Sequence, residues 1–288
     1  MSSRMIITVT AIAGLFVVLF ALERLVQLRR PARPLLGRLL VNAVVSILAL
    51  LAATFTVRPT ISSYFSWTSD QPFGVLHLLP LPIGARLVLA FLLLDLTFYY
   101  WHRANHRIAF LWRFHNVHHV DPDLDVTTAF RFHFGELAMS AAFRVVQLVL
   151  IGPPALAYVV YETAFQANTL FHHSNVRLPI GLERGINKVL VTPRMHGIHH
   201  SQIEEETNSN YSVVFSWWDR LHRTLRLDVA QSAIAIGIPG YSSPEDNRPL
   251  RVLTMPFERQ REYFRRPDGT GPGRVRDAQG ADPRRLAE

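Results

Sequence analysis

The sequence contains no cysteine, and this absence excludes several kinds of site. Disulfide bonds, iron–sulfur clusters, thiolate-ligated haem and cysteine-type zinc sites all require the thiol group. The chain also lacks a recognisable flavin, haem or pyridine-nucleotide motif. A metal bound by this chain must therefore be held by nitrogen and oxygen ligands, and electrons for a redox reaction must come from another molecule.

Charged residues are missing from two long stretches near the amino terminus. Residues 5–22 are a run of 18 without a charge, and residues 39–57 are a run of 19 in which Asn42 is the one strongly polar side chain. At a rise of about 1.5 Å per residue, each run is long enough to cross the hydrocarbon core of a bilayer. A third run, residues 87–101, is shorter and contains Asp95.

The first apolar run has a second interpretation. It could be a secretory signal peptide, because Arg4 precedes it. However, it lacks a small-x-small cleavage site and is followed by Glu23, Arg24 and a basic stretch. These features favour a retained membrane anchor.

Eight of the 13 histidines fall into three clusters. One cluster reads His-x-x-x-His and two read His-x-x-His-His, at positions His102, His106, His115, His118, His119, His196, His199 and His200. On a helix, residues three or four apart lie on one face, so each cluster can direct at least two imidazoles at one point. Neutral imidazole is the commonest metal ligand in proteins and suits iron, zinc and copper. Because eight ligands exceed what one ion can use, the spacing predicts two metals held close together.

Other polar residues lie near these clusters. His172 and His173 end an apolar stretch, and we expect His173 to be a ninth ligand. His133 and Glu136 precede another apolar stretch, and His133 could be either a ligand or the hydrogen-bond partner of a ligand. The aspartates at 121, 123 and 125 are expected to be solvated turn and cap residues rather than ligands.

Asp95 is the one acidic residue inside the third apolar run. It lies seven residues before His102, which is about 10 Å along a helix axis and too far for both to bind one ion. Two roles remain open. Asp95 could accept a hydrogen bond from another imidazole, or it could be a buried aspartate bonded to a neighbouring helix.

The net charge is +8, and the placement of the arginines predicts an orientation. Several lie between the first two apolar runs, which by the positive-inside rule marks this connection as cytoplasmic. Two further crossings then bring His102 to the same side, so the histidine clusters are expected at the cytoplasmic face. Nucleic-acid binding is disfavoured because the arginines are spread along loops beside membrane spans.

These patterns predict an all-α integral membrane bundle of about four to five membrane helices with a cytoplasmic, histidine-rich helical cap. Residues 58–82 should form an interfacial loop or short amphipathic piece, residues 179–193 a connector, and residues from 265 a disordered tail. Helices are expected at residues 1–26, 36–56, 83–108, 110–120, 136–151 and 154–171, the last two as a hairpin that enters the membrane and returns to the same side.

At this point the chain resembles the fatty acid hydroxylase and sterol desaturase superfamily of integral membrane oxygenases. The resemblance covers about residues 87–225. Its motifs are the three histidine clusters with Asp95, Tyr99, Tyr100, Trp101, Arg131, Phe132, His133, His173, Ser174, Asn175, Asn210, Tyr211, Trp218, Asp219, Arg220 and Leu221. The chain departs from the usual pattern at Ser212, where glycine is common, and at His222-Arg223, where Phe-Gly is common.

The resemblance implies a centre of two iron ions that uses molecular oxygen and two electrons to hydroxylate or desaturate a C–H position of a lipid, such as a fatty acyl chain or a sterol. Breaking a strong C–H bond requires redox chemistry that acid–base side chains cannot supply. The implied partners are a lipid from the bilayer and an external electron donor, which could be a cytochrome, a ferredoxin or a reductase. The implied ligands are the eight clustered histidines and His173, and the residues implied to support them are Asp95, His133, Glu136, His172 and Asn175.

With this resemblance, the chain divides into four expected parts. Residues 1–83 are membrane helices and an interfacial loop, and residues 84–226 a fatty acid hydroxylase-type di-iron domain. Residues 227–264 are a carboxy-terminal extension, and residues 265–288 the tail.

Two other classes of protein also combine clustered histidines with apolar spans. A membrane metal transporter would place its ligands near the bilayer midplane, whereas these clusters lie at the ends of the expected helices. A di-zinc hydrolase acting on lipid head groups would use three or four protein ligands per ion and leave an open position. Eight or nine histidines would crowd such a site.

Overall fold

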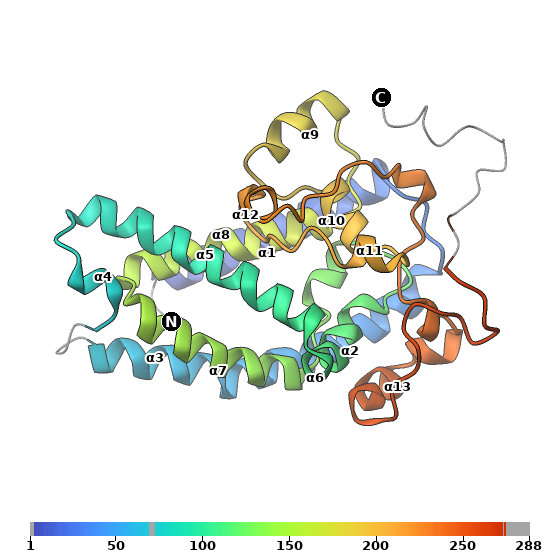
Figure 1. The fold of residues 1–288 in the computed structure, drawn as a ribbon, viewed down its shortest axis with the longest axis horizontal. Helices are drawn as coiled ribbons and strands as arrows, with labels where there is room; N and C mark the ends of the chain where they lie inside the picture. Colours follow the sequence, from blue (N-terminus) through green and yellow to red (C-terminus); the bar gives the residue numbers. More distant parts are fainter. Residues whose placement is uncertain (1–2, 69–72, 273, 275–288) are drawn as a thin grey trace.

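The computed structural model describes residues 3–68, 73–272 and 274. In this part of the chain the regular structure is helical, and strand pairing is limited to three isolated bridges. The long helices run along the longest axis of the molecule (Figure 1); they are α1 (Ser3–Leu25), α2 (Leu35–Phe55), α5 (Ile83–Arg107), α7 (Phe134–Ile151) and α8 (Ala155–His173). The predicted all-α bundle is confirmed.

Long apolar surfaces cover the outside of this bundle. Large side chains such as Leu36 and Leu50 are 82% and 67% exposed. Lipid tails solvate such surfaces, whereas water does not. Among the described residues, four helical runs are long and apolar enough to cross a membrane, namely Ile6–Leu25, Leu35–Thr68, Ile83–Arg107 and Phe134–Ile151. The expectation of four to five membrane helices is confirmed, and the chain is a membrane protein.

For residues 58–82 two alternatives were expected, an interfacial loop or a short amphipathic piece, and the structure contradicts the loop. α3 (Val57–Thr68) continues α2 after the single turn residue Thr56, and α4 (Val75–Leu78) follows it. Pro59 does not prevent α3, because it lies in the first turn, where backbone N–H groups have no partner within the helix. Most of the expected loop is therefore helical.

Two further expectations concern the second half of the chain. Residues 179–193 contain a helix, α9 (Ile180–Asn187), rather than only a connector. The tail expected from residue 265 falls largely outside the described residues, which omit 273 and 275–288. Residues 265–272 are described and form turns and irregular backbone.

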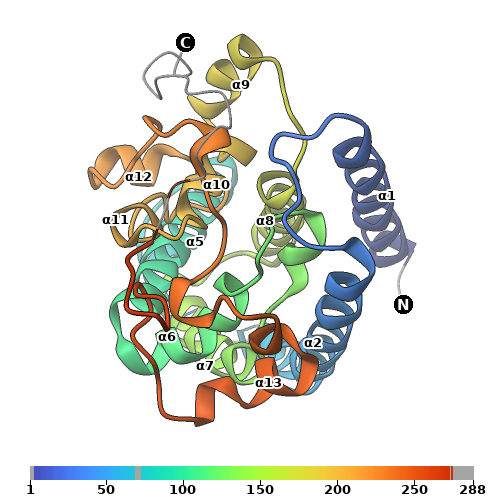
Figure 2. The same cartoon turned by 90° about the vertical axis from the view of Figure 1, so that its right-hand side faces the viewer.

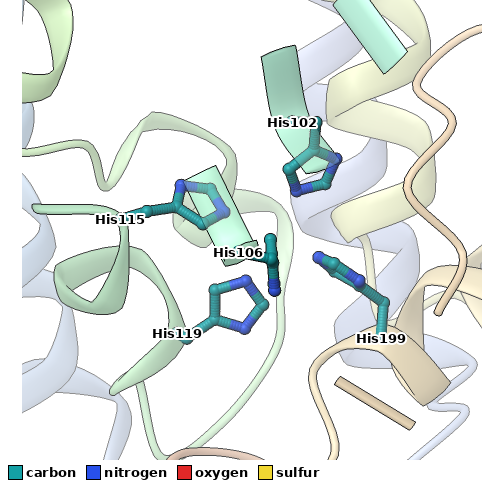
Figure 3. Close-up of side chains that lie close together, drawn as sticks. All are labelled: His102, His106, His115, His119 and His199. Carbon is teal, nitrogen blue, oxygen red and sulfur yellow. The ribbon is translucent and has the colours of Figure 1, made fainter. Parts of the chain in front are cut away.

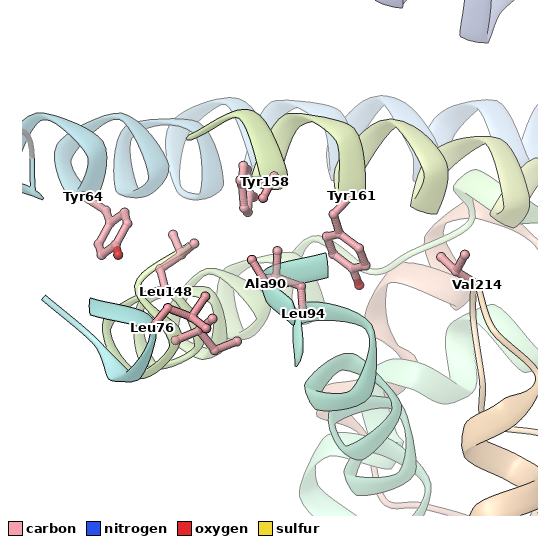
Figure 4. Close-up of a cluster of buried hydrophobic side chains, with 10 residues drawn as sticks. Tyr64, Leu76, Ala90, Leu94, Leu148, Tyr158, Tyr161 and Val214 are labelled. Atoms are coloured by element: carbon pink, nitrogen blue, oxygen red, sulfur yellow. The ribbon is translucent and has the colours of Figure 1, made fainter. Parts of the chain in front are cut away.

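The middle of the bundle is held by a buried apolar cluster (Figure 4). It contains Leu76 of α4, Leu94 of α5, Leu148 of α7 and Tyr161 of α8, each fully buried. Because lipid tails are as apolar as these side chains, the helices gain stability here from close packing more than from removal of water. The cluster therefore fixes the position of α5 relative to α8, and both of these helices carry histidines.

Two glycines let the turn between α7 and α8 approach the rest of the chain. Gly152 ends α7 with a φ of 68°, and Gly74 precedes α4 with a φ of 103°. A Cβ atom on Gly74 would lie 2.4 Å from the backbone nitrogen of Gly152. Only glycine adopts these conformations at such a short approach without strain. The predicted hairpin is present, with its closed end packed against the residues before α4.

The other end of the bundle carries the short elements, and Figure 2 shows this end facing the viewer. Its helices are α6 (Ala109–His119), α10 (Pro193–His199), α11 (Glu204–Thr207), α12 (Trp217–Leu221) and α13 (Pro249–Thr254). The 3-10 turns are η1 (Val126–Phe130), η2 (Gln231–Ala233), η3 (Pro239–Tyr241), η4 (Pro244–Asn247) and η5 (Met255–Phe257). Residues after 227 pack onto α6, where Trp112 is buried against Ile238, Tyr241 and Met255.

Candidate metal centre

Nine histidines from four parts of the chain meet at this end of the bundle. α5 contributes two, α6 three, the last residue of α8 one, and α10 with the residue after it three. α10 begins with Pro193 at its first position, where proline favours helix initiation. The four segments thus bring together His102, His106, His115, His118, His119, His173, His196, His199 and His200.

The histidines divide into two groups. We call the first the α5 group; its ligand atoms all lie within 4.8 Å of one another, and Figure 3 shows its rings directed at a common centre. Its members are His102, His106, His115, His119 and His199. We call the second the α8 group, which obeys the same limit and consists of His118, His173, His196 and His200. Each group can surround one ion.

The two His-x-x-His-His motifs contribute to both groups in opposite ways. In α6, His115 and His119 join the α5 group while His118 joins the α8 group. At α10 the arrangement is reversed, because His196 and His200 join the α8 group and His199 joins the α5 group. Residues four apart share a helix face, and their neighbour one position away is turned by about 100°. The motif therefore supplies two adjoining sites from one helix.

Hydrogen bonds fix the orientation of four imidazoles. Nδ1 of His102 lies 2.7 Å from the carbonyl of Tyr211, and Nδ1 of His199 lies 2.7 Å from that of Ser209. Because a carbonyl can only accept, each Nδ1 carries the proton and each Nε2 keeps a lone pair. His173 is held in the same way by the carbonyl of Thr169, at 2.8 Å.

The fourth oriented imidazole belongs to His115. Its Nδ1 lies 2.9 Å from a carboxylate oxygen of Glu136, and both side chains are buried. Glu136 was expected to support the site, and the structure places it in contact with a histidine of the α5 group. Carboxylate and carbonyl partners of this kind fix the tautomer of metal-binding histidines.

The Nε2 atoms of the α8 group lie close together. In the α8 group the Nε2 atom of His173 lies 3.1 Å from that of His118 and 3.0 Å from that of His196, which lies 3.1 Å from that of His200. A neutral imidazole has one N–H, and His173 already uses its own on Thr169. A cation between the rings would bind all four lone pairs.

In the α5 group, several buried ring nitrogens lack hydrogen-bond partners. Among the described residues, both ring nitrogens of His106 and His119 and the Nε2 atoms of His115 and His199 have none. Each unsatisfied buried group costs roughly 1–3 kcal/mol. Burial, together with His115, lowers the pKa of His199 to about 3, so its ring is neutral at pH 7 as metal binding requires. The residues therefore fit a pair of metal ions.

Asp95 does not contact an imidazole, so the structure corrects one of its two expected roles. Its carboxylate accepts hydrogen bonds from the backbone N–H groups of Val214 and Phe215 and from Nε1 of Trp218, at 3.3, 3.0 and 2.7 Å. This is the alternative role, a buried aspartate bonded to another part of the chain. Asp95 holds the segment that follows Tyr211, whose carbonyl orients His102.

Two expected supporting residues lie outside the centre. His133 is the N-cap of α7, where its Nδ1 accepts from the backbone N–H of Gly135 while its Nε2 lies 3.1 Å from the carbonyl of Leu253. Asn175 binds the backbone of Arg29 with both its amide atoms. His172 is closer, because its ring lies 4.2 Å from that of His196, but it belongs to neither group.

The aspartate-rich turn is buried, not solvated as expected. Arg38 of α2 forms ion pairs with Asp121 and Asp125, at 3.0 and 2.8 Å. Although burial opposes its ionisation, Arg38 and Arg131 lower the pKa of Asp121 to about 2. Asp125 caps η1 as a cap residue should. The network ties α2 to the residues directly after the second histidine cluster.

Sequence reasoning did not assign a role to Asn210. Its φ of 55° is in the left-handed region, and the residues on either side, Ser209 and Tyr211, are those whose carbonyls orient His199 and His102. Its side chain bonds to Met195 and Arg226. Asparagine tolerates this conformation better than most residues. The Asn210-Tyr211 pair could be recognised in the sequence as a motif. The sequence did not reveal that the backbone around Asn210 orients two histidines.

Comparison with known proteins finds a match to one protein family. Residues 87–224 match the family described as fatty acid hydroxylase. These residues include every histidine of both groups. No solved structure matches the chain at a significant level.

Several curated proteins are similar over part of their length. An ornithine lipid hydroxylase of Rhizobium tropici is 29% identical over 210 residues, which are 73% of this chain and 59% of that protein. Human alkylglycerol monooxygenase is 30% identical over 142 residues, or 48% of this chain and 30% of that protein. Human cholesterol 25-hydroxylase is 26% identical over 49% of this chain and 51% of its own length. The match thus spans between 30% and 59% of the length of these relatives.

Proposed function

We propose that the chain, whose residues 87–224 match the fatty acid hydroxylase family, is a membrane oxygenase that hydroxylates a C–H position of a lipid. The relatives are named as hydroxylases or monooxygenases of an ornithine lipid, alkylglycerols and cholesterol. They share oxygen insertion into a lipid but differ in the lipid. The proposal is therefore hydroxylation, with desaturation as the less supported outcome.

The observation that carries this proposal is the pair of adjoining histidine groups. Eight buried imidazoles and the partly buried ring of His106 offer more nitrogen ligands than a single zinc site uses. When bound there, two iron ions would supply the activation of molecular oxygen that lipid hydroxylation needs. Overall, the lipid C–H, one O2, two electrons and two protons give the alcohol and one water.

The residues of the chain have separate tasks in this proposal. The α5 and α8 groups hold the two ions, and Tyr211, Ser209, Thr169 and Glu136 keep four of the imidazoles in the tautomer with a free Nε2. The apolar surfaces of the long helices keep the substrate in the bilayer. The electrons come from an external donor at the histidine-bearing end, which by the distribution of arginines is the cytoplasmic side.

An oxygen-labelling experiment tests the proposal. The full chain is purified in detergent, supplied with ferrous iron, and incubated with a ferredoxin, its reductase, NADPH, isotopically labelled O2 and a bacterial lipid extract. We expect a lipid product that has gained one labelled oxygen atom, and no such product from His199→Ala. Release of lipid head groups without use of O2 would contradict the proposal and favour a hydrolase.

A further inference from the structure

A cavity of about 510 Å³ lies beside the metal centre, and none of the nine histidines lines it. Part of its wall is the connection between α1 and α2. Another part includes Val120, Asn175 and Gln202, each one or two positions after a histidine of the centre. Since successive Cα atoms are about 3.8 Å apart, these wall residues lie within about 8 Å of histidine backbones. The volume is in the range of small-molecule sites.

The lining of this cavity carries more positive than negative charge. It includes five arginines and three carboxylates, namely Arg24, Arg29, Arg30, Arg33, Arg38, Glu23, Asp123 and Asp125. The carboxylates are already engaged. Asp123 accepts from the backbone N–H groups of Ala32 and Arg33, and Glu23 from those of Val126 and Asn175. Five arginines against three carboxylates leave the lining with an excess of positive charge, and the engaged carboxylates offer no free acid to a cation.

Four of the lining arginines have donors without a partner in the described part of the chain, and in Arg24 this is the buried Nε. The side chains of Arg30 and Arg33 are exposed and form no hydrogen bond or ion pair within residues 3–68, 73–272 and 274. Arg29 is 8% exposed, and its Nη1 donates to Gln231 at 2.6 Å. Its Nε and Nη2 atoms are buried and lack partners in the same described part of the chain.

We propose that this cavity binds the anionic headgroup of a membrane lipid. Guanidinium groups donate in pairs to phosphate and carboxylate oxygens, and five arginines line this cavity. The cavity adjoins the ends of α1 and α2, where these apolar helices leave the hydrocarbon and lipid headgroups lie. The inference goes beyond the proposed oxygenase reaction, because it concerns a binding site that does not require the metal.

The test uses the full metal-free chain in a neutral detergent. Native mass spectrometry measures the binding of phosphatidylglycerol and of phosphatidylcholine with the same acyl chains, and inorganic phosphate is added as a competitor. The variant Arg30→Gln/Arg33→Gln removes the exposed donors. Arg259→Gln removes an exposed arginine of the same end that does not line the cavity. Because the side chains of Arg30 and Arg33 have no partner among the residues that the structure describes, we expect the thermal unfolding of the lipid-free variants to match that of the wild type.

We expect one phosphatidylglycerol per chain, held at least tenfold more tightly than phosphatidylcholine and than inorganic phosphate. The double variant should bind phosphatidylglycerol at least tenfold more weakly than the wild type, and Arg259→Gln should bind it as tightly as the wild type. Equal affinity for phosphatidylglycerol and phosphatidylcholine, or an unchanged double variant, would overturn the site. Inorganic phosphate binding as tightly as the lipid would instead assign the cavity to a soluble anion and overturn the lipid headgroup.

Discussion

Removal of the Glu136 carboxylate should weaken one metal site and spare the other. Glu136 is buried and orients His115, one of five histidines in the α5 group, and it contacts no histidine of the α8 group. Without it, Nδ1 of His115 has no acceptor and the ring can change its tautomer. Loss of such a partner lowers metal affinity by roughly 10- to 100-fold, or about 1.4–2.7 kcal/mol. Glu136→Ala should therefore retain part of its activity when iron is abundant.

The assay is an anaerobic titration of the metal-free protein with ferrous iron against a competing chelator, which resolves two binding constants. For Glu136→Ala we expect one constant to fall by the stated factor and the other to stay within twofold. Glu136→Gln keeps an acceptor oxygen in the same place and should fall less. Two unchanged constants would refute the role of Glu136, and equal weakening of both would refute the division of the histidines into two groups.

Two further predictions follow from residues outside the groups. His133→Asn should keep its full iron content, because His133 caps α7 and asparagine can also cap a helix; loss of one iron per chain would make His133 a ligand after all. Asp121→Asn should lower the free energy of unfolding of the metal-free protein by about 2 kcal/mol at pH 7. Since the pKa of Asp121 falls from 3.8 to about 2 on folding, this difference should be full above pH 4 and vanish as the pH falls through 2; a difference independent of pH would contradict the ion pairs.

The long helices and the histidines could be predicted because their signals are local. Runs without charge define the spans, and spacings of three and four residues define which imidazoles share a helix face. The assignment of His118 and His199 to their groups could not be predicted. It depends on how α6 and α10 face one another. These helices are some 80 residues apart in the sequence, and no local sequence pattern encodes their relative orientation.

The errors at Asp95 and at the aspartate-rich turn have a common physical origin in contacts between distant parts of the chain. Asp95 bonds to a backbone segment more than 100 residues away, so its spacing from His102 was uninformative. The aspartates after His119 looked like solvated turn residues because their partner, Arg38, lies in α2. The carbonyls that orient His102 and His199 belong to the backbone, which every residue has, so no side-chain pattern reveals them.

The most direct test of the central claim is the metal content of the full chain. The protein is reconstituted with ferrous iron without oxygen, passed over a chelating resin, and analysed for iron and zinc per chain. We predict two irons in the wild type, with His199→Ala and His173→Ala each losing one, since they belong to different groups. A single iron in the wild type, or retention of two irons in both variants, would contradict the account of two adjoining sites.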